Sequence, residues 1–279
     1  MKSKLRRMKS KLRRSIRTAS GDIPTGYVIY KGPSRIDGSP IVIILIEKSG
    51  NTKTGNMLQT YIIRSDMNPL AAVDSGADIS ICSNCPHRGG IVDILTGIIT
   101  ERTCYVNLGQ GPLSVFNAYT RGNYPQLSVH HPIIQEMVQD RMVRLGTYGD
   151  PYAAPMGYWN ALLTNAKSWT GYTHQWRTAP DLKHLCMASC DCESDFQLAQ
   201  SMGWRTFRVR LEDSMLFERE IDCPASKQSG YRTTCERCRL CKGDSIKAKS
   251  VSIPMHGSAA HIKRSKVLLP ILEMQSCRS

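Results

Sequence analysis

From about residue 100 onward, the sequence repeats one pattern: a short apolar run that ends abruptly in a polar residue whose side chain can take part in catalysis or bind a metal. Asp150, His174, Asp191 and His256 each follow such a run, and several runs lead into residues at helical spacing. In a (β/α) barrel the carboxyl ends of the strands gather at one face, where active sites lie. The pattern predicts an α/β fold with an irregular or partial (β/α) barrel, because some intervals are too short for a full crossover helix. An open doubly wound sheet is the alternative, with a site at similar strand ends.

The N-terminal part has a different pattern. Three runs rich in β-branched residues, at 27–30, 40–47 and 57–64, are separated by turn-forming Gly, Pro, Asp and Asn. They predict an antiparallel β-sheet that packs on the rest of the chain. We therefore expect a basic disordered tail (1–20), an N-terminal β-sheet region (21–75), a cysteine-rich partial barrel (76–265) and a C-terminal tail (266–279).

Eleven cysteines set this chain apart from an average protein. Their number is odd and the N-terminus lacks the apolar core of an export signal, so metal ligation is favoured over disulfides. In the clearest group, Cys235, Cys238 and Cys241 stand at two-residue gaps and Cys223 precedes a proline. Such a set can hold a 4Fe–4S cluster, and the same thiolates can also form a closed tetrahedral zinc site. We predict a metal here and favour iron–sulfur over zinc.

A second group consists of Cys82, Cys85 and Cys104. Three thiolates can hold a cluster that leaves one iron open for a small molecule. The alternatives are a second zinc, with His87 or an outside group as fourth ligand, and buried thiols without metal. Cys186 and Cys190 lie in an apolar stretch and are interpreted as core residues.

The four polar residues at the ends of the apolar runs are the candidates for catalysis. A histidine can transfer protons near neutral pH, and a carboxylate can orient it or a substrate. Tyr148 and Arg205 are candidates for lining the same rim. Gly109 and Gly111 precede a predicted helix, whose first amides can hold a phosphate; a plain loop is the alternative.

Charge is concentrated at the N-terminus. The formal net charge is +14, but nine of the 37 Lys and Arg fall in residues 1–17, where the segment MKSKLRR occurs twice in tandem. This arm could bind the phosphates of a nucleic acid, or it could be a duplication without a role. The body alone carries about +5, which supports nucleic-acid binding only weakly. No apolar run reaches the length of a membrane span.

Several segments together resemble an uncharacterised family of phage and prophage proteins, over roughly residues 20–265. The segments are RLGTYGDP (144–151), GYTHQW (171–176), CMASCD (186–191), GWRTFRVR (203–210), CPAS (223–226), TTCERCRLCKG (233–243) and IPMHG (253–257). The C-terminal part is similar to the mycobacteriophage gene-product-88 family and, more distantly, to radical-SAM-like phage barrels. The resemblance implies a partial TIM barrel with cysteine-bound metal, located in the cytoplasm of a bacterial host. The chain departs from the radical SAM pattern, whose three cysteines stand at gaps of three and two residues in one loop.

These observations lead to one main hypothesis and two alternatives. The main hypothesis is a phage-encoded iron–sulfur protein with redox or radical chemistry on a nucleic-acid-linked or phosphate-bearing substrate. The first alternative is a zinc-stabilised nucleic-acid-binding protein that serves phage DNA replication. A rolling-circle nickase is less favoured, because the adjacent His130 and His131 would point to opposite faces of a strand. Whether the protein is an enzyme stays open at this point.

Overall fold

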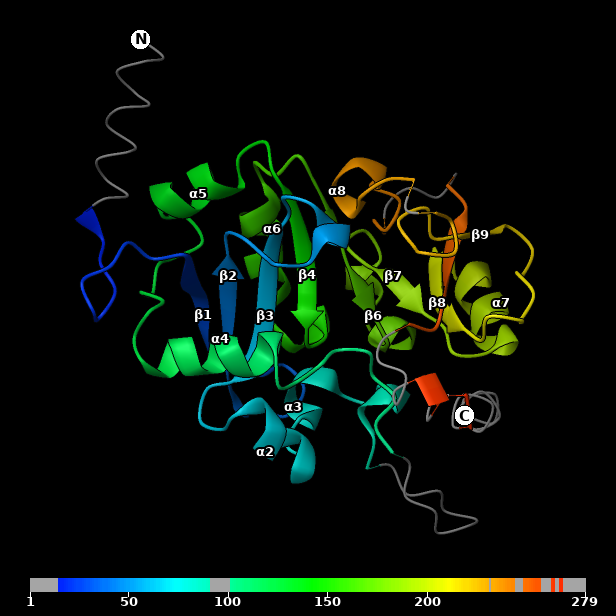
Figure 1. The fold of residues 1–279 in the computed structure, drawn as a ribbon, viewed down its shortest axis with the longest axis horizontal. Coiled ribbons are helices and arrows are strands. Elements are labelled where there is room, and N and C mark those ends of the chain that lie inside the picture. The colour runs from blue at the N-terminus through cyan, green and yellow to red at the C-terminus, as the bar shows by residue number, and fades with distance from the viewer. Residues whose placement is uncertain are drawn as a thin grey trace.

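The computed structural model describes residues 15–90, 101–230, 232–243, 248–256, 262–263 and 266–267. Within them the protein is an α/β fold with two five-stranded sheets (Figure 1). Residues 1–14 of the predicted tail, most of the predicted C-terminal tail, and Cys277 lie outside the described residues. No helix in the described part combines the length and apolar character that a membrane crossing requires.

The first sheet contains the predicted N-terminal strands and extends beyond them. Its strands, in spatial order, are β1 (Gly26–Pro33), β2 (Pro40–Ile46), β3 (Leu58–Arg64), β4 (Met142–Tyr148) and β5 (Ser168–Thr170). The first three pair in antiparallel fashion, which confirms the predicted antiparallel sheet. β4 then joins β3 in parallel, and β5 joins β4. The boundary suggested at residue 75 therefore lies within the span of one hydrogen-bonded sheet.

The second sheet is parallel throughout. Its spatial order is β6 (Tyr172–Thr173), β7 (Met187–Ser189), β8 (Thr206–Arg210), β10 (Ser250–Pro254) and β9 (Glu220–Asp222). β10, the last of the described strands, thus lies between two earlier ones, β8 and β9. Parallel strands that run side by side end at the same edge of the sheet. The parallel pairing of β6, β7 and β8 therefore brings their carboxyl ends together, as the pattern of apolar runs predicted.

Short helices connect and cover the strands. They are α2 (Pro69–Asp74), α3 (Ile79–Cys82), α4 (Gly111–Thr120), α5 (Pro132–Val138), α6 (Met156–Leu163), α7 (Glu193–Ser201) and α8 (Cys235–Cys238), with 3-10 turns η1 (Thr52–Thr54), η2 (Pro86–Arg88), η3 (Pro151–Ala153), η4 (Gln175–Arg177) and η5 (Pro180–Leu182). Capping residues explain where some of these helices begin and end. The Asn68 side chain accepts hydrogen bonds from the first amides of α2, where Pro69 fills the first position. Gly203, with φ +75°, follows α7.

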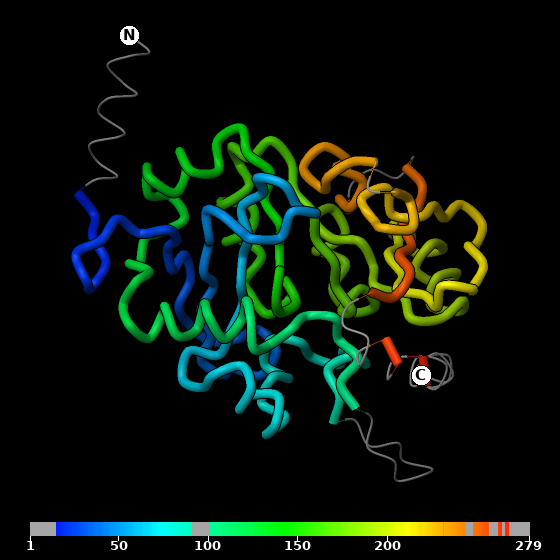
Figure 2. The backbone as a smooth tube through the Cα atoms, in the orientation of Figure 1, coloured from blue at the N-terminus to red at the C-terminus, as the bar shows by residue number. Residues whose placement is uncertain are grey.

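Gly171 joins the two sheets. It is the single residue between β5 and β6; its N–H donates to the carbonyl of Cys241, and its carbonyl accepts from Met187. A Cβ at this position would lie 2.9 Å from the Cys186 Sγ, so only glycine fits without a shift. The chain thus passes from the first sheet to the second at this point, and Figure 2 traces its whole path. The described strands nevertheless form no closed barrel, so the structure bears out the α/β class but not the barrel.

Candidate functional site

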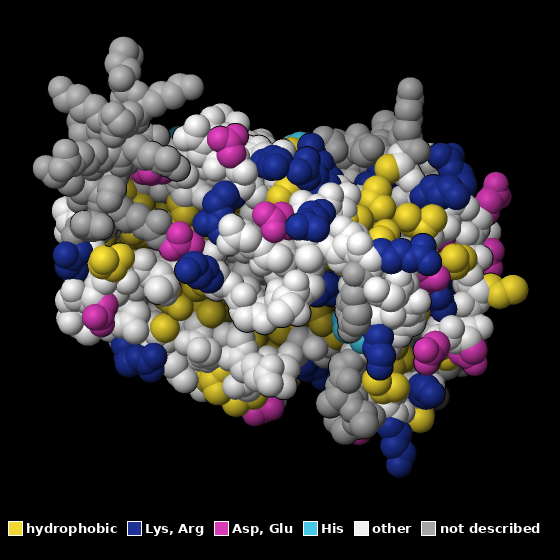
Figure 3. Space-filling model, turned by 45° about the horizontal axis from the view of Figure 1, so that its top comes forward, with side chains coloured by type: hydrophobic (Ala, Val, Ile, Leu, Met, Phe, Trp, Pro, Cys, Tyr) yellow, Lys and Arg dark blue, Asp and Glu magenta, His cyan; other side chains and the backbone are white. Residues whose placement is uncertain are grey.

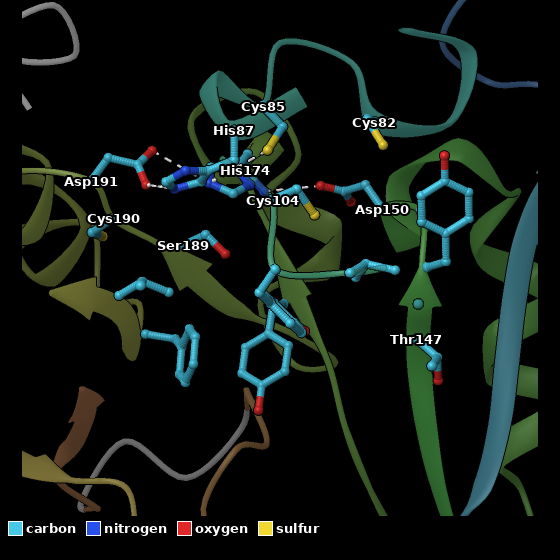
Figure 4. A pocket seen from close by; sticks show the side chains of 18 residues that line it. Cys82, Cys85, His87, Cys104, Thr147, Asp150, His174, Ser189, Cys190 and Asp191 are labelled. Atoms are coloured by element: carbon cyan, nitrogen blue, oxygen red, sulfur yellow. Dashed lines mark hydrogen bonds and ion pairs between the residues drawn. The ribbon is translucent and has the colours of Figure 1, made fainter. Parts of the chain in front are cut away.

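A cavity of about 150 Å³ opens where β4, β6 and β7 end. We call it the strand-end pocket. Its polar lining includes Asp150, His174 and Asp191, three of the four residues that the sequence singled out as catalytic candidates. Its other walls are largely apolar and aromatic, with Tyr172 and Phe207 in contact at a ring distance of 4.4 Å. Figure 4 shows the polar residues and the cysteines around this cavity.

The end of β4 is shaped to present Asp150. Gly149 has φ +83°, and a Cβ there would lie 2.8 Å from the carbonyl oxygen of Ile62, so the position requires glycine. The Asp150 carboxylate accepts hydrogen bonds from the backbone N–H of Tyr152 and of His174, each at 2.9 Å. Burial raises the pKa of Asp150, while these amide bonds oppose the rise. Through its bond to the His174 N–H, Asp150 therefore fixes the backbone that carries the His174 ring.

Asp191 lies between two imidazole rings. Its Oδ1 is 2.9 Å from Nε2 of His87, and its Oδ2 is 3.3 Å from Nε2 of His174. Burial alone would raise the pKa of Asp191, but the charges and hydrogen bonds of the two histidines lower it below its usual value. Burial opposes protonation of His174, yet the neighbouring Cys85 and Asp191 outweigh it and raise the pKa of His174 well above normal.

Cys82, Cys85 and Cys104 all line the strand-end pocket, although a segment of about twenty residues separates the first two from the third. The backbone N–H groups of Thr103 and Cys104 donate to the carbonyl of His87, which places the two segments side by side. Burial raises the pKa of Cys82 well above normal, and the nearby Cys85 and Cys104 add to it. The three thiols therefore converge, and a second metal centre on them stays a prediction.

A buried ion pair anchors the loop that carries these residues. Arg88 donates to the Asp78 carboxylate at 2.6 Å and to the carbonyl of Gly76 at 2.6 Å. Asp78 is almost fully buried, so the guanidinium compensates a charge that water cannot reach. The pair ties the turn after α2 to η2, and thereby fixes the position of His87 at the pocket.

The other four predicted metal ligands lie together at a second, smaller pocket. Cys223 follows β9, Cys235 and Cys238 belong to α8, and Cys241 comes just after it. We call this the four-cysteine site. None of the ten cysteines in the described part of the chain forms a disulfide. Burial raises the pKa of Cys241 to about 12; the Tyr172 hydroxyl, which donates to its sulfur, opposes the rise, and the other three thiols add to it.

The remaining predicted residues are spread over different parts of the fold. Arg205 precedes β8 and lies outside the strand-end pocket. Tyr148 lines the pocket, whereas Gly109 and Gly111 do not. His256 is outside it as well, but its ring stacks on Tyr105 of the pocket wall at 5.6 Å.

Two features of the site carry little or no signal in the sequence pattern. The sequence indicates His87 only as an alternative zinc ligand, yet His87 contacts Asp191 directly, because the turn at Pro86 brings it to the strand ends. Thr103, which no motif indicates, bonds Nδ1 of His87 at 2.8 Å. As for the nickase, His131 caps α5 through its ring nitrogen, and neither it nor His130 lines the pocket.

Among the described residues, the strand-end pocket and the four-cysteine site are the two candidate functional sites. Comparison of the chain with protein-family models, with curated proteins and with solved structures gives no significant match.

Proposed function

We propose that this protein is a cysteine-ligated metalloprotein whose four-cysteine site holds an iron–sulfur cluster. The observation that supports it is the convergence of Cys223, Cys235, Cys238 and Cys241, from separate segments, on one small pocket as free thiols. Burial and the neighbouring thiols raise the pKa of Cys235, Cys238 and Cys241, and a bound metal would relieve that cost by taking the thiolates. The donor set suits such a cluster.

The spacing of the sulfurs favours a cluster over a single zinc ion. Tetrahedral zinc, with Zn–S bonds of about 2.3 Å, holds its sulfurs about 3.8 Å apart. Among the described residues, no three thiols have Sγ atoms that all lie within 4.8 Å of one another. No three of the four cysteines thus have the close mutual spacing of a single zinc ion, and this arrangement is compatible with a larger inorganic centre.

We propose that the strand-end pocket binds a substrate that is oxidised or reduced, and that the cluster exchanges the electrons with it. Tyr172 supports this link, because it lines the strand-end pocket and its hydroxyl bonds Cys241 of the four-cysteine site. No Lys or Arg is among the described residues that line the pocket. We therefore propose a small, mainly apolar substrate in place of the phosphate-bearing one that the sequence suggested.

The zinc-stabilised nucleic-acid-binding protein is the rival proposal. In Figure 3, Lys and Arg on the visible face are interspersed with Asp and Glu and apolar side chains. A mixed surface of this kind gives less attraction for a phosphate backbone than a continuous basic stripe. The phage or prophage origin that the resemblance implies is compatible with either proposal.

Anaerobic purification followed by iron, sulfide and zinc analysis tests the proposal. We expect a brown protein with about four iron and four sulfide per chain at the four-cysteine site. Cys238→Ser should lose this iron, since it removes one of the four thiolates. Cys192→Ser is the control, because it makes the same change at a cysteine that lies outside both candidate sites. It should keep the iron.

Two outcomes contradict the proposal. A colourless protein with one zinc per chain, lost in Cys238→Ser, would show the rival centre. Unchanged iron in Cys238→Ser would show that the four-cysteine site is not the cluster site.

A further inference from the structure

Three donor groups meet at one side of the strand-end pocket. The ligand atoms of His87, His174 and Asp191 all lie within 4.8 Å of one another. Each Nε2 is 2.9 or 3.3 Å from a carboxylate oxygen of Asp191. A metal with bonds of about 2.1 Å holds its ligand atoms roughly 3.0 to 3.4 Å apart, so the three groups, which now bond one another, are also spaced closely enough to share one ion.

The same contacts argue against a catalytic triad with Cys85 as nucleophile. In a triad, the histidine uses one ring nitrogen for the nucleophile and the other for the carboxylate. Here Nε2 of His174 faces both the Cys85 sulfur, at 4.0 Å, and Asp191. A proton cannot be relayed through the ring in this arrangement, whereas one nitrogen facing several donors is typical of metal coordination.

Neighbouring residues orient the three groups as they do around known metal sites. Thr103 bonds Nδ1 of His87, which leaves Nε2 to face the pocket. Asp150 holds the backbone N–H of His174. In Figure 4 the two rings point toward Asp191 at the edge of the cavity.

A fourth pocket residue independently points to a ligand. Tyr148 is 3% exposed, and its hydroxyl has no hydrogen-bond partner among the described residues. A buried hydroxyl without a partner costs free energy that a bound polar group would recover. Tyr148 lines the same cavity as the two histidines and Asp191.

We propose that His87, His174 and Asp191 bind one divalent first-row transition-metal ion in the strand-end pocket. Two histidines and a carboxylate would leave coordination positions open, and all three residues line the cavity. The ion would take an oxygen-bearing ligand, such as a carboxylate, a carbonyl or water, within reach of the apolar walls. This inference does not require a cluster at the four-cysteine site, which uses none of these residues.

Titration of the full chain with Co²⁺ alone tests the site, followed by visible absorption and calorimetry. The protein is first loaded at the four-cysteine site, so that Co²⁺ reports the strand-end pocket. We expect one equivalent to bind. His87→Ala and Asp191→Asn should each weaken binding by more than about 100-fold, and Thr103→Val by about 10-fold, because it frees the ring without removing a ligand.

His184→Ala is the matched control, because His184 is exposed and lies outside the pocket. Unchanged iron content and circular dichroism show that each variant is folded. Co²⁺ binding that persists in both His87→Ala and Asp191→Asn would overturn the inference. So would binding that is lost in Cys82→Ser and Cys104→Ser but kept in His87→Ala, since the thiols would then hold the ion.

The two proposals fail separately. If the four-cysteine site takes no metal, the same titration in a Cys238→Ser background still measures the strand-end pocket. If Co²⁺ finds no site while iron is bound, only this inference falls.

Discussion

Arg205 illustrates, at the scale of one residue, how position along a strand decides a role. The sequence suggested that it lines the rim of the active face. It stands just before β8, at the opposite end of the strand, and is almost fully buried. Its guanidinium donates to the carbonyls of Lys242 and Lys249, at 2.6 and 2.7 Å, and also to those of Leu240 and Ala248. Arg205 therefore holds the backbone on both sides of Cys241.

Replacing Arg205 by Lys should weaken metal binding at the four-cysteine site without removing a ligand. A lysine ammonium cannot donate to four carbonyls in the fixed fork of a guanidinium. We expect about a tenfold loss of metal affinity, measured by competition with a chelator. Arg237→Lys, on the exposed side of α8, is the control and should leave affinity unchanged. Equal affinity in both variants would contradict this role.

The catalytic candidates show what periodicity can and cannot predict at this scale. Asp150, His174 and Asp191 could be predicted, because each follows an apolar run and parallel strands end together. His87 could not, because its place depends on a turn and on pairing with residues 103–104 across the intervening segment. Such long-range pairing leaves no period in the sequence.

At the scale of elements, β8 combines two different faces. Phe207 and Val209 line the strand-end pocket, and the alternate residues point the other way. Among these, Arg208 forms a 2.6 Å ion pair with Glu220, whose side chain is fully buried. The guanidinium also lies 3.7 Å from the centre of the Phe217 ring. The pair links β8 to β9 across the intervening β10.

Arg208→Ala should strongly destabilise the fold, because it leaves the Glu220 carboxylate buried without a partner. We expect a loss of about 3 to 5 kcal/mol in the free energy of unfolding, measured by urea denaturation. Arg35→Ala is the comparison, because Arg35 and its partner Asp181 are both about a third exposed, at 34% and 39%, and can be solvated. It should cost about 1 kcal/mol or less. Equal losses in the two variants would refute this reasoning.

The strands themselves could largely be predicted, but their partners could not. The β-branched runs at 27–30, 40–47 and 57–64 give β1, β2 and β3. In the sheet, β3 is followed by β4, which lies about eighty residues later in the sequence. This parallel pairing is not encoded by any local sequence signal. This pairing merges the two predicted regions into one sheet.

At the scale of the whole molecule, the two candidate sites lie on either side of the crossing between the sheets. Gly171 donates to the carbonyl of Cys241, and the next residue, Tyr172, faces the strand-end pocket. Cys223 and Cys241 pack in the same small apolar cluster as Val251 of β10. The second sheet thus has a small core of its own, and the four-cysteine site is part of it.

If the four-cysteine site holds the proposed metal, its removal should loosen the second sheet and leave the first intact. Ligand thiolates released by a chelator would take up protons and lose the metal bonds that tie Cys223 of the loop after β9 to Cys235, Cys238 and Cys241. We expect faster amide hydrogen exchange in β8, β9 and β10, measured by mass spectrometry, while β1, β2 and β3 keep their protection. The first sheet is the internal control, because its buried core contains none of the four ligands. Uniform loss of protection would mean that the metal stabilises the fold as one unit, and no change would mean that the four-cysteine site has no structural role.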